Sequence, residues 1–186
     1  MPLIIETPRL ILRQWNESDL DPWAAMNADP RVMEFFPGTN DRARSEETAN
    51  RMRISLERDG YGLWAVELKH NGSFAGMIGL NDIPYSVPFE PRREVGWRLA
   101  YDAWGCGYAA EGARAALRVA FDTLGWDEVV AMTAFVNLRS ERVMQRVGMV
   151  RDLTGDFDHP RIEEGHPLRR HMLYRIRKGG MPAESG

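Results

Sequence analysis

A glycine-rich turn that runs into an alanine-rich helical pattern is the segment whose residue types point most directly to chemistry. The segment AWGCGYAAEGA, residues 103–113, places Gly105 and Gly107 just before the expected start of the helix. No Ser, Thr, Asn or Asp stands between Trp104 and Ala110, so no such side chain caps the first N–H groups of the helix. Uncapped N–H groups and the positive end of the helix dipole attract anions, and glycines let a phosphate approach closely. The turn therefore predicts a phosphate-binding site.

Two familiar phosphate motifs fit this turn poorly. Residues 105–110 formally match the dinucleotide fingerprint G-x-G-x-x-G/A, and the acids Asp127 and Glu128 stand at about the expected spacing. A dinucleotide motif belongs to a doubly wound βαβ chain, whereas here a β-meander pattern precedes the turn and the acids begin the next strand. A Walker loop is excluded because no Gly-Lys-Ser/Thr follows. A nicotinamide-binding oxidoreductase therefore stays only as a weak alternative.

Cysteine and histidine give little support for covalent or metal chemistry. Cys106 lies in the turn, where a helix N-terminus would lower the pKa of its thiol, but no His stands near it in the sequence. The 4 His residues lack the spacing of metal ligands, and His159 and His166 each precede Pro in a polar segment. We therefore expect neither a cysteine nucleophile nor a metal site.

The elements that must position the turn follow an α+β order. Strand-like runs are expected at 9–15, 62–69, 73–83, 93–100, 128–136, 149–153 and 171–177. Helical patterns run from Ser18 or Asp19 to before Pro30, from Ser45 to near Gly60, from about 108 to 124, and from Asn137 to Gly148. Asn71-Gly72 predicts a hairpin, and residues 93–136 form a parallel-looking β–α–β crossover.

Composition and charge bound the class of protein. The chain has 186 residues, which fit a single domain at 1–178 with a flexible tail at 179–186. The net charge of −3 argues against a nucleic-acid partner. No run approaches the roughly 20 apolar residues of a membrane span, and the first residues do not resemble a secretory signal. A single cysteine cannot form an internal disulfide, so we expect a cytoplasmic protein.

Two longer segments resemble a known enzyme family. EVGWRLAYDAWGCGYAAEG, residues 94–112, resembles the acetyl-CoA-binding motif of the Gcn5-related N-acetyltransferases (GNAT). VNLRSERVMQRVGMV, residues 136–150, resembles the second motif of that family, Asn-x-x-Ser followed by an apolar helix. The opening ETPRLILRQW and the closing HMLYRI are similar to the branch that contains the ribosomal-protein alanine acetyltransferases. The sequence departs from the family pattern at Trp104, Cys106 and Met149, where Gln or Arg, a basic residue and Phe are usual.

The resemblance implies a fold and a reaction. The fold is the α+β GNAT acyl-CoA N-acyltransferase fold, with a mixed, mostly antiparallel seven-stranded sheet, about four helices and a splayed central strand pair. The reaction is direct transfer of an acetyl group from acetyl-CoA, as co-substrate, to a primary amine. The peptide groups of Trp97, Arg98 and Leu99 would bind the pantetheine where the strands at 93–100 and 128–136 separate.

The resemblance also implies roles for individual residues. Glu94 is the candidate general base, acting through water, and Ser140 is the candidate acid that protonates the leaving thiolate, with Tyr108 as a rival acid. A surface ion pair for Glu94 and a first-turn helical role for Ser140 remain open alternatives. The residues expected to bind the cofactor are Trp97, Arg98, Leu99, Trp104, Gly105, Cys106, Gly107, Tyr108, Ala109, Ala110 and Asn137.

The acceptor is not identified by the sequence. A protein N-terminus, an aminoglycoside, a polyamine or an amino acid would each supply an amine, and an acyl group longer than acetyl stays open. Segments 31–44 and 152–169 are expected to form the acceptor side, because the cofactor motifs do not use them. The acidic excess of 152–169 would attract a cationic amine. We expect no membrane or nucleic-acid partner, a homodimer stays open, and the alternative function is an inactive acyl-CoA-binding module or sensor.

Overall fold

The structure, a computed structural model that describes residues 3–182, is a mixed α+β fold built on an eight-stranded sheet. The order of strands in the sheet is β1-β2-β3-β4-β5-β6-β8-β7. Every neighbouring pair is antiparallel except β5 and β6, which are parallel. The strands are β1 Ile5–Glu6, β2 Leu10–Arg13, β3 Leu63–Leu68, β4 Phe74–Asp82, β5 Arg93–Leu99, β6 Glu128–Ala134, β7 Val150–Asp158 and β8 Arg170–Arg177.

Two features of the sheet differ from the sequence-based expectation. The expected seven strands become eight because Ile5–Glu6 pairs with β2, and a strand of 2 residues is too short to show an alternating pattern. The strand expected at 149–153 continues to Asp158. Its pairing with β8 shifts register between Asp152 and Phe157, which interrupts the alternation that identifies a strand in the sequence.

Four α-helices connect the strands of the described chain: α1 Leu20–Ala28, α2 Arg42–Asp59, α3 Tyr108–Arg118 and α4 Leu138–Arg146. A π-helical turn at Val119–Thr123 continues α3, so the helical pattern ends where the sequence indicates. The second helix begins earlier than expected, because Asp41 accepts a hydrogen bond from the Arg44 N–H and is the N-cap. Ser45, the expected start, is buried inside this helix.

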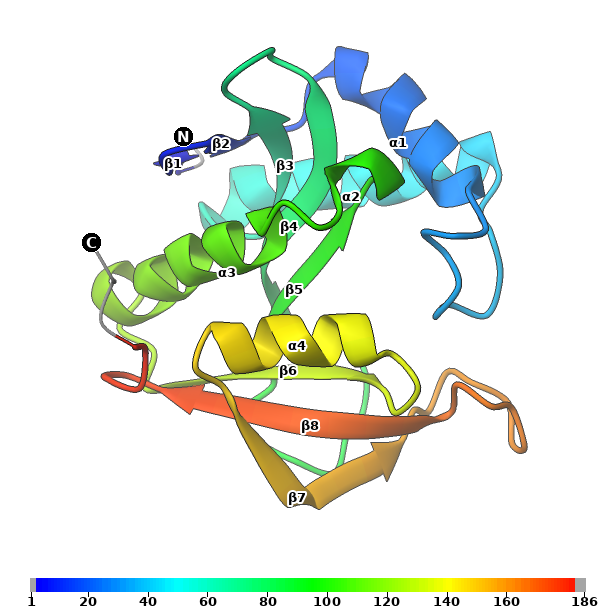
Figure 1. Ribbon diagram of the computed structural model, residues 1–186, viewed down its shortest axis with the longest axis vertical. Helices are drawn as coiled ribbons and strands as arrows, with labels where there is room; N and C mark the ends of the chain where they lie inside the picture. Colours follow the sequence, from blue (N-terminus) through cyan, green and yellow to red (C-terminus); the bar gives the residue numbers. More distant parts are fainter. Residues whose placement is uncertain (1–2, 183–186) are drawn as a thin grey trace.

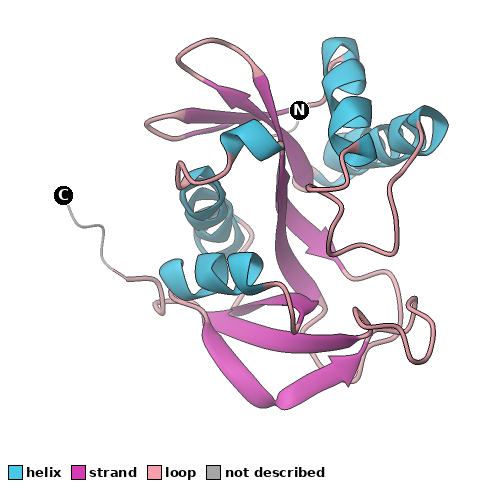
Figure 2. Ribbon diagram, turned by 45° about the vertical axis from the view of Figure 1, so that its right-hand side comes forward, coloured by secondary structure: helices cyan, strands magenta, loops and turns pink. Residues whose placement is uncertain are grey.

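The helices cover the two faces of the sheet differently (Figures 1 and 2). Helices α1 and α2 pack together on one side of β3 and β4, while α3 lies on the opposite side, over β4 and β5. The main core fills both interfaces with buried apolar side chains, among them Trp23, Trp64, Ile78 and Leu117. Both helical layers therefore hold β4 and β5 in place.

The sheet separates between β5 and β6. These two strands pair at a single register position, Glu94 with Val130, whereas β4 pairs with β5 over seven positions and β6 with β8 over seven. In Figure 1, β5 diverges from β6, with α3 and α4 beside the opening. Since α3 is the crossover helix between the two strands, its N-terminus lies where β5 ends. This is the splayed strand pair that the sequence predicts.

The C-terminal end of the described chain lies against the main core. After β8, Met181 packs against the main core. The remainder of the tail expected from 179, residues 183–186, lies outside the described residues. Within residues 3–182, no helix combines the length and apolar character that crossing a membrane demands.

Candidate active site

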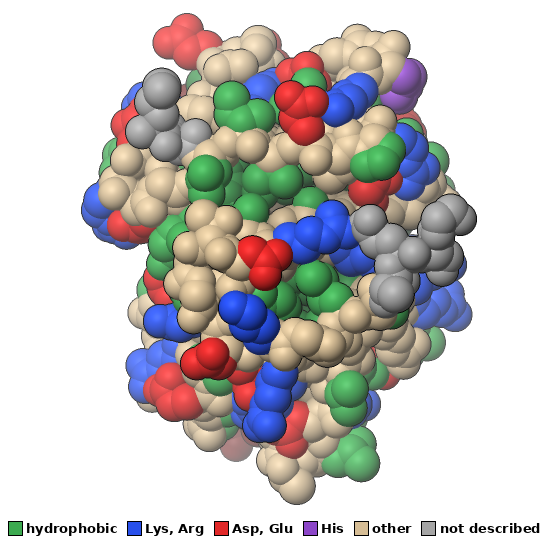
Figure 3. All heavy atoms as spheres, turned by 90° about the vertical axis from the view of Figure 1, so that its left-hand side faces the viewer, with side chains coloured by type: hydrophobic (Ala, Val, Ile, Leu, Met, Phe, Trp, Pro, Cys, Tyr) green, Lys and Arg blue, Asp and Glu red, His purple; other side chains and the backbone are tan. Residues whose placement is uncertain are grey.

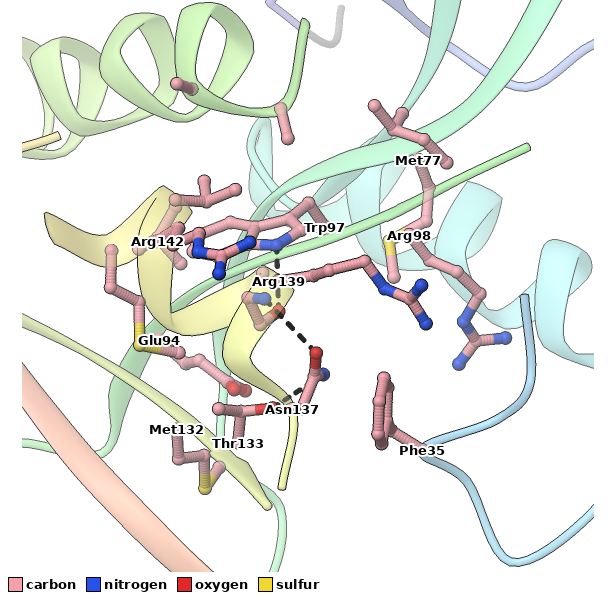
Figure 4. A pocket seen from close by; sticks show the side chains of 18 of the residues that line it. Phe35, Met77, Glu94, Trp97, Arg98, Met132, Thr133, Asn137, Arg139 and Arg142 are labelled. Carbon is pink, nitrogen blue, oxygen red and sulfur yellow. Dashed lines mark hydrogen bonds between the residues drawn. The ribbon is translucent and has the colours of Figure 1, made fainter. Parts of the chain in front are cut away.

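A cavity of about 570 Å³ occupies the opening between β5 and β6. Its walls come from both strands, the start of α3, one side of α4 and the segment 32–36 that follows α1. Figure 4 shows side chains from these elements around one space. On the face turned to the viewer in Figure 3, hydrophobic side chains lie in a hollow with Lys and Arg side chains beside it. The cavity therefore collects residues from segments far apart in the sequence.

The glycine turn forms one wall of this cavity. Gly105 and Gly107 have φ values of 76° and 82°, a region that favours glycine. Gly107 occupies the N-cap position of α3, and no side chain caps the helix. Trp104, Gly105, Gly107, Tyr108, Ala109 and Ala110 all line the cavity. The free N–H groups expected from the sequence are thus present, and they face a space large enough for a ligand.

Cys106 is the one predicted cofactor residue that does not line the cavity. Its side chain is exposed, and its thiol lies 3.5 Å from the Trp104 carbonyl oxygen. Its own carbonyl oxygen accepts a hydrogen bond of 2.9 Å from Arg9 Nη1. The arginine also stacks 4.7 Å from the centre of the Tyr108 ring and pairs with Glu111. Sequence reasoning missed Arg9, because it approaches the turn from the bend before β2, 97 positions earlier in the chain than Cys106.

The two faces of β5 serve different sides of the site. Trp97 lies on the face toward α4, where its Nε1 donates a hydrogen bond of 3.1 Å to Ser140 Oγ. Glu94 and Arg98 lie on the other face, because successive side chains alternate along a strand. Beyond Glu94 the strand has no further register partner in β6. The edge from Gly96 to Leu99 is therefore available to a ligand that adds to the sheet as an extended chain.

Glu94 combines partial burial with a raised pKa. The side chain is partly buried and lines the cavity, opposite Asn81 in the β4–β5 pairing. Burial raises the pKa of Glu94 to about 7, while a hydrogen bond from Asn81 opposes the rise. A carboxyl group with this pKa is half ionised near neutral pH, which suits a general base. The alternative of a surface ion pair is wrong, because Glu94 forms no ion pair within the described chain and is not exposed.

Asn137 and Ser140 form one hydrogen-bonded unit at the start of α4. Asn137 Oδ1 accepts a hydrogen bond from the Ser140 N–H at 3.2 Å, and its Nδ2 donates to Thr133 Oγ1 at 2.9 Å. The Ser140 hydroxyl accepts a hydrogen bond from Trp97, and Ser140 lines the cavity. The N-cap role and a place beside the ligand space are therefore compatible, as the sequence indicates for Asn137.

Three polar aromatic residues near Glu94 were not found from the sequence. The Tyr85 hydroxyl and His159 Nε2 lie 2.9 Å apart, and the rings of His159 and His171 are 4.8 Å apart. All three residues line the cavity. Burial lowers the pKa of His159 to about 4, so the imidazole is neutral at physiological pH. Their segments carry no motif, and only the fold brings them together.

The segment 152–169 differs from the acidic loop that the sequence predicts. Its first part is strand β7, and its three aspartates are paired: Asp152 with Arg175 at 2.7 Å, Asp156 with Arg151 at 2.9 Å, and Asp158 with Arg170 at 3.3 Å. These ion pairs offset the acidic excess, so the expected attraction of cationic amines loses its basis. Only His159 of this segment lines the cavity.

Metal chemistry has no support in the described part of the chain. Within residues 3–182, no group of three or more His, Cys, Asp or Glu side chains is arranged to hold a metal ion. The dinucleotide alternative also loses its structural basis. The strand that leads into the glycine turn, β5, pairs antiparallel with the preceding strand β4, whereas a dinucleotide motif needs a βαβ unit.

Comparisons with known proteins point to one family. The family model described as an acetyltransferase (GNAT) domain matches residues 9–150. An FsC-acetyl coenzyme A-N(2)-transacetylase from Aspergillus fumigatus is 31% identical over 192 aligned positions, which cover 95% of this chain and 80% of the relative. The match therefore extends over both motifs and over the strands that carry them.

Solved structures agree with this result. An acetyltransferase from Agrobacterium tumefaciens has a TM-score of 0.75 and 27% identity, with 96% of each chain covered. A ribosomal L7/L12 alpha-N-protein acetyltransferase in complex with coenzyme A has a TM-score of 0.72 and 17% identity, covering 94% of this chain and 98% of that one. The second likeness concerns the fold alone.

Proposed function

Because this chain belongs to the GNAT acetyltransferase family, we propose that it transfers an acetyl group from acetyl-CoA directly to a primary amine. The acceptor is a protein N-terminus or a small-molecule amine. One observation carries the proposal: the uncapped N-terminus of α3 and the partly buried Glu94 open into the same cavity. The name of the Aspergillus relative, which states acetyl coenzyme A and an N(2) position, supports both the donor and a nitrogen acceptor.

The cofactor would be held mainly by backbone groups. Its pyrophosphate would accept hydrogen bonds from the N–H groups of residues 105–110, and its pantetheine would lie along the free edge of Trp97, Arg98 and Leu99. Asn137 would contact the pantetheine from α4. Arg142 and Arg146 of α4 line the same cavity and form no ion pair within the described residues. Their charges would complement the phosphates.

The chemistry needs one base and one acid. Glu94 would remove a proton from the ammonium form of the acceptor through a water molecule, which leaves a free electron pair on nitrogen. The nitrogen would then attack the thioester carbonyl carbon, so that a C–N bond forms and the C–S bond breaks, and the nitrogen would release its second proton to water to give the neutral amide. The sulfur leaves as thiolate and takes the proton of the Ser140 hydroxyl, which is restored from water. The hydrogen bond that Trp97 donates to Ser140 stabilises the deprotonated oxygen during this step.

The test is an acceptor screen with the purified chain. Acetyl-CoA is mixed with peptides, polyamines, aminoglycosides and amino acids, and released CoA thiol and the mass of the acetylated product are measured. We expect thiol release that depends on both the chain and one class of amine. Binding of CoA by calorimetry without thiol release from any amine would instead favour the inactive acyl-CoA-binding module, and protection by NAD but not by CoA would exclude the transferase.

A further inference from the structure

Arg98 is a cationic side chain in the cavity wall that lacks an anionic partner. It lies on the same face of β5 as Glu94 and lines the cavity. Its Nε is buried without a hydrogen-bond partner, and it forms no ion pair with any residue in the part of the chain that the structure describes. Removing a guanidinium from water without a counter-charge is costly. Burial accordingly lowers the pKa of Arg98 to about 10.

Arg13, a second partly buried arginine, has a purely structural environment and can be compared with Arg98. Arg13 contacts Asp19 at 2.7 Å and Glu67 at 2.7 Å, so two carboxylates neutralise it, and its pKa is raised. Arg98 has aromatic neighbours instead, with its guanidinium 4.1 Å from the centre of the Phe36 ring and 5.4 Å from that of Trp23. Aromatic faces attract a cation but do not neutralise it.

The position of the Arg98 side chain is fixed by a buried hydrogen-bond chain. Arg98 Nη1 donates to Asn27 Oδ1 at 2.8 Å, Asn27 Nδ2 donates to Ser45 Oγ at 3.2 Å, and Ser45 Oγ donates to the Asp41 carbonyl oxygen at 2.8 Å. Asn27 and Ser45 are fully buried. The chain ties the guanidinium to α1 and α2 and occupies Nη1. Nη2 has no hydrogen bond within the described chain and is not sealed from solvent, so it is free for a ligand in the cavity.

We propose that the acceptor amine also carries a carboxylate, which binds the free edge of the Arg98 guanidinium while the amine lies near Glu94. This inference rests on the proposed acetyl transfer. The Nη2 end of the guanidinium, which is not buried, can donate a charge-assisted hydrogen bond to a carboxylate oxygen, and the carboxylate would supply the missing counter-charge. Positions 94 and 98 are about 13 Å apart along a strand. The acceptor would therefore be an extended molecule, with its amine and its carboxylate separated by several bonds.

The test compares amines in matched pairs that differ only in the anionic group. Glycylglycine is paired with glycylglycinamide, and ε-aminocaproate with ε-aminocaproamide. For each pair the ratio of kcat/KM is measured, and calorimetry measures binding of the corresponding N-acetyl products to the CoA-loaded chain, which needs no turnover. We expect the carboxylate member to be preferred by at least about 10-fold in both measurements, as for other buried charge pairs.

Substitutions then assign the preference to Arg98. Arg98→Met should bring the ratio close to one, and Arg98→Lys, which keeps the charge, should restore part of it. Arg177→Met is the matched control: Arg177 pairs with Glu128 at 2.9 Å at the end of β8 and does not line the cavity, so its ratio should equal that of the wild type. Melting temperatures and CoA affinity verify that each variant is folded.

The outcomes separate this inference from the proposed function. Equal use of both members by the wild type, or an unchanged ratio in Arg98→Met, overturns the carboxylate assignment while acetyl transfer stands. Failure to bind CoA and to acetylate any amine contradicts the proposed function instead. If transfer is absent but CoA binds, the product pairs still decide: equal affinities for the two members overturn the inference.

Discussion

The two walls of the cavity are built in different ways. One wall, which we propose holds the cofactor and call the cofactor wall, is formed by residues 104, 105 and 107–110 with Asn137, and it presents backbone N–H groups, two glycines at positive φ and two alanines. The other, which we propose faces the acceptor and call the acceptor wall, is formed by Glu94, Arg98, Tyr85 and His159. It presents ionisable side chains that come from β5, from the connection after β4 and from the end of β7. The cofactor wall would bind through backbone groups. The acceptor wall would bind through side chains that the fold brings together from distant parts of the sequence.

This difference predicts a different response to pH. The N–H groups of the cofactor wall do not titrate, so their attraction for phosphate is constant across the physiological range. In the acceptor wall, burial raises the pKa of Glu94 to about 7 and lowers that of His159 to about 4. The pH dependence of the reaction should therefore lie in acceptor turnover and not in cofactor affinity.

The largest expected effect comes from Gly107→Val. Gly107 has a φ of 82°, which a β-branched residue rarely adopts, and its added side chain would lie where we place the phosphate. We expect CoA affinity to fall at least about 100-fold, which corresponds to about 2.7 kcal/mol. Isothermal titration calorimetry measures it. Unchanged affinity would show that the cofactor wall does not work through this turn.

The matched control is Gly125→Val. Gly125 has a φ of 66°, and a Cβ added there, as at Gly107, would meet no backbone atom, but Gly125 lies at the far end of the crossover helix. Both variants should lose stability through backbone strain, on the order of 1–2 kcal/mol. Only Gly107→Val should lose CoA affinity. A similar loss in both would mean that instability, not the anion site, explains the result.

Glu94→Gln is the corresponding change in the acceptor wall. Acetyl-CoA affinity should stay within a few-fold, while kcat falls about 100-fold, the usual contribution of a positioned base. Wild-type kcat/KM should rise with pH up to about 7, the pKa of Glu94, and the variant should lack this inflection. Steady-state kinetics over a pH series measures both. Near-normal turnover at neutral pH would place the base elsewhere.

The ionisation of Glu94 should also make the free energy of unfolding depend on pH in a predictable direction. Because the folded pKa of Glu94, about 7, exceeds its ordinary value of 4.5, the native state binds the proton more tightly than the unfolded state. The resulting stabilisation is fully present below pH 4.5 and is lost as the pH rises through about 7. Denaturant titrations of the wild type should show this decline in the free energy of unfolding, and Glu94→Gln should not.

The cofactor wall could be predicted from the sequence because its signal is local. The glycines Gly105 and Gly107 and the small residues Ala109 and Ala110 lie within six positions of one another, in a stretch that has no capping side chain. Each of these features directly affects the backbone conformation or its free N–H groups. The parallel crossover also follows from the order of elements, whereas the opening of the sheet is implied by the family resemblance. Cys106 is the exception, because a residue within a tight turn can point away from the ligand.

The acceptor wall could not be predicted in the same way. Tyr85 and His159 meet only through the sheet, and their neighbours in the sequence show no spacing that would link them. The aspartates of 152–169 count as free charge in the sequence, although their arginine partners in β7 and β8 neutralise them. Counting charged residues in a sequence gives the net charge of a segment but not its ion pairs. The ion pairs decide which charges remain to interact with a ligand.

A smaller effect separates two candidate proton donors, one in each motif. Ser140→Ala should lower kcat about 10-fold, less than the roughly 10²- to 10⁴-fold of a fully effective general acid, because water can replace the hydroxyl that Trp97 holds at 3.1 Å. Tyr108→Phe should change kcat less, since the Tyr108 ring packs under Arg9. Thiol release at saturating acetyl-CoA compares them. A larger loss in Tyr108→Phe would move the proton donor to the cofactor wall, and its backbone-only description would then be wrong.

The smallest expected effect concerns Arg9, the charged side chain that reaches the glycine turn from outside. Its guanidinium is about half exposed and hydrogen-bonds the Cys106 carbonyl oxygen, so water and salt screen its charge. Arg9→Met should weaken CoA binding only about 3- to 5-fold, less than about 1 kcal/mol. Lys69→Met, which breaks a surface pair with Glu6 at 2.8 Å, should leave CoA affinity unchanged. A loss for Arg9→Met as large as that for Gly107→Val would show that a distant side chain supplies the phosphate site, and both walls would then depend on side chains.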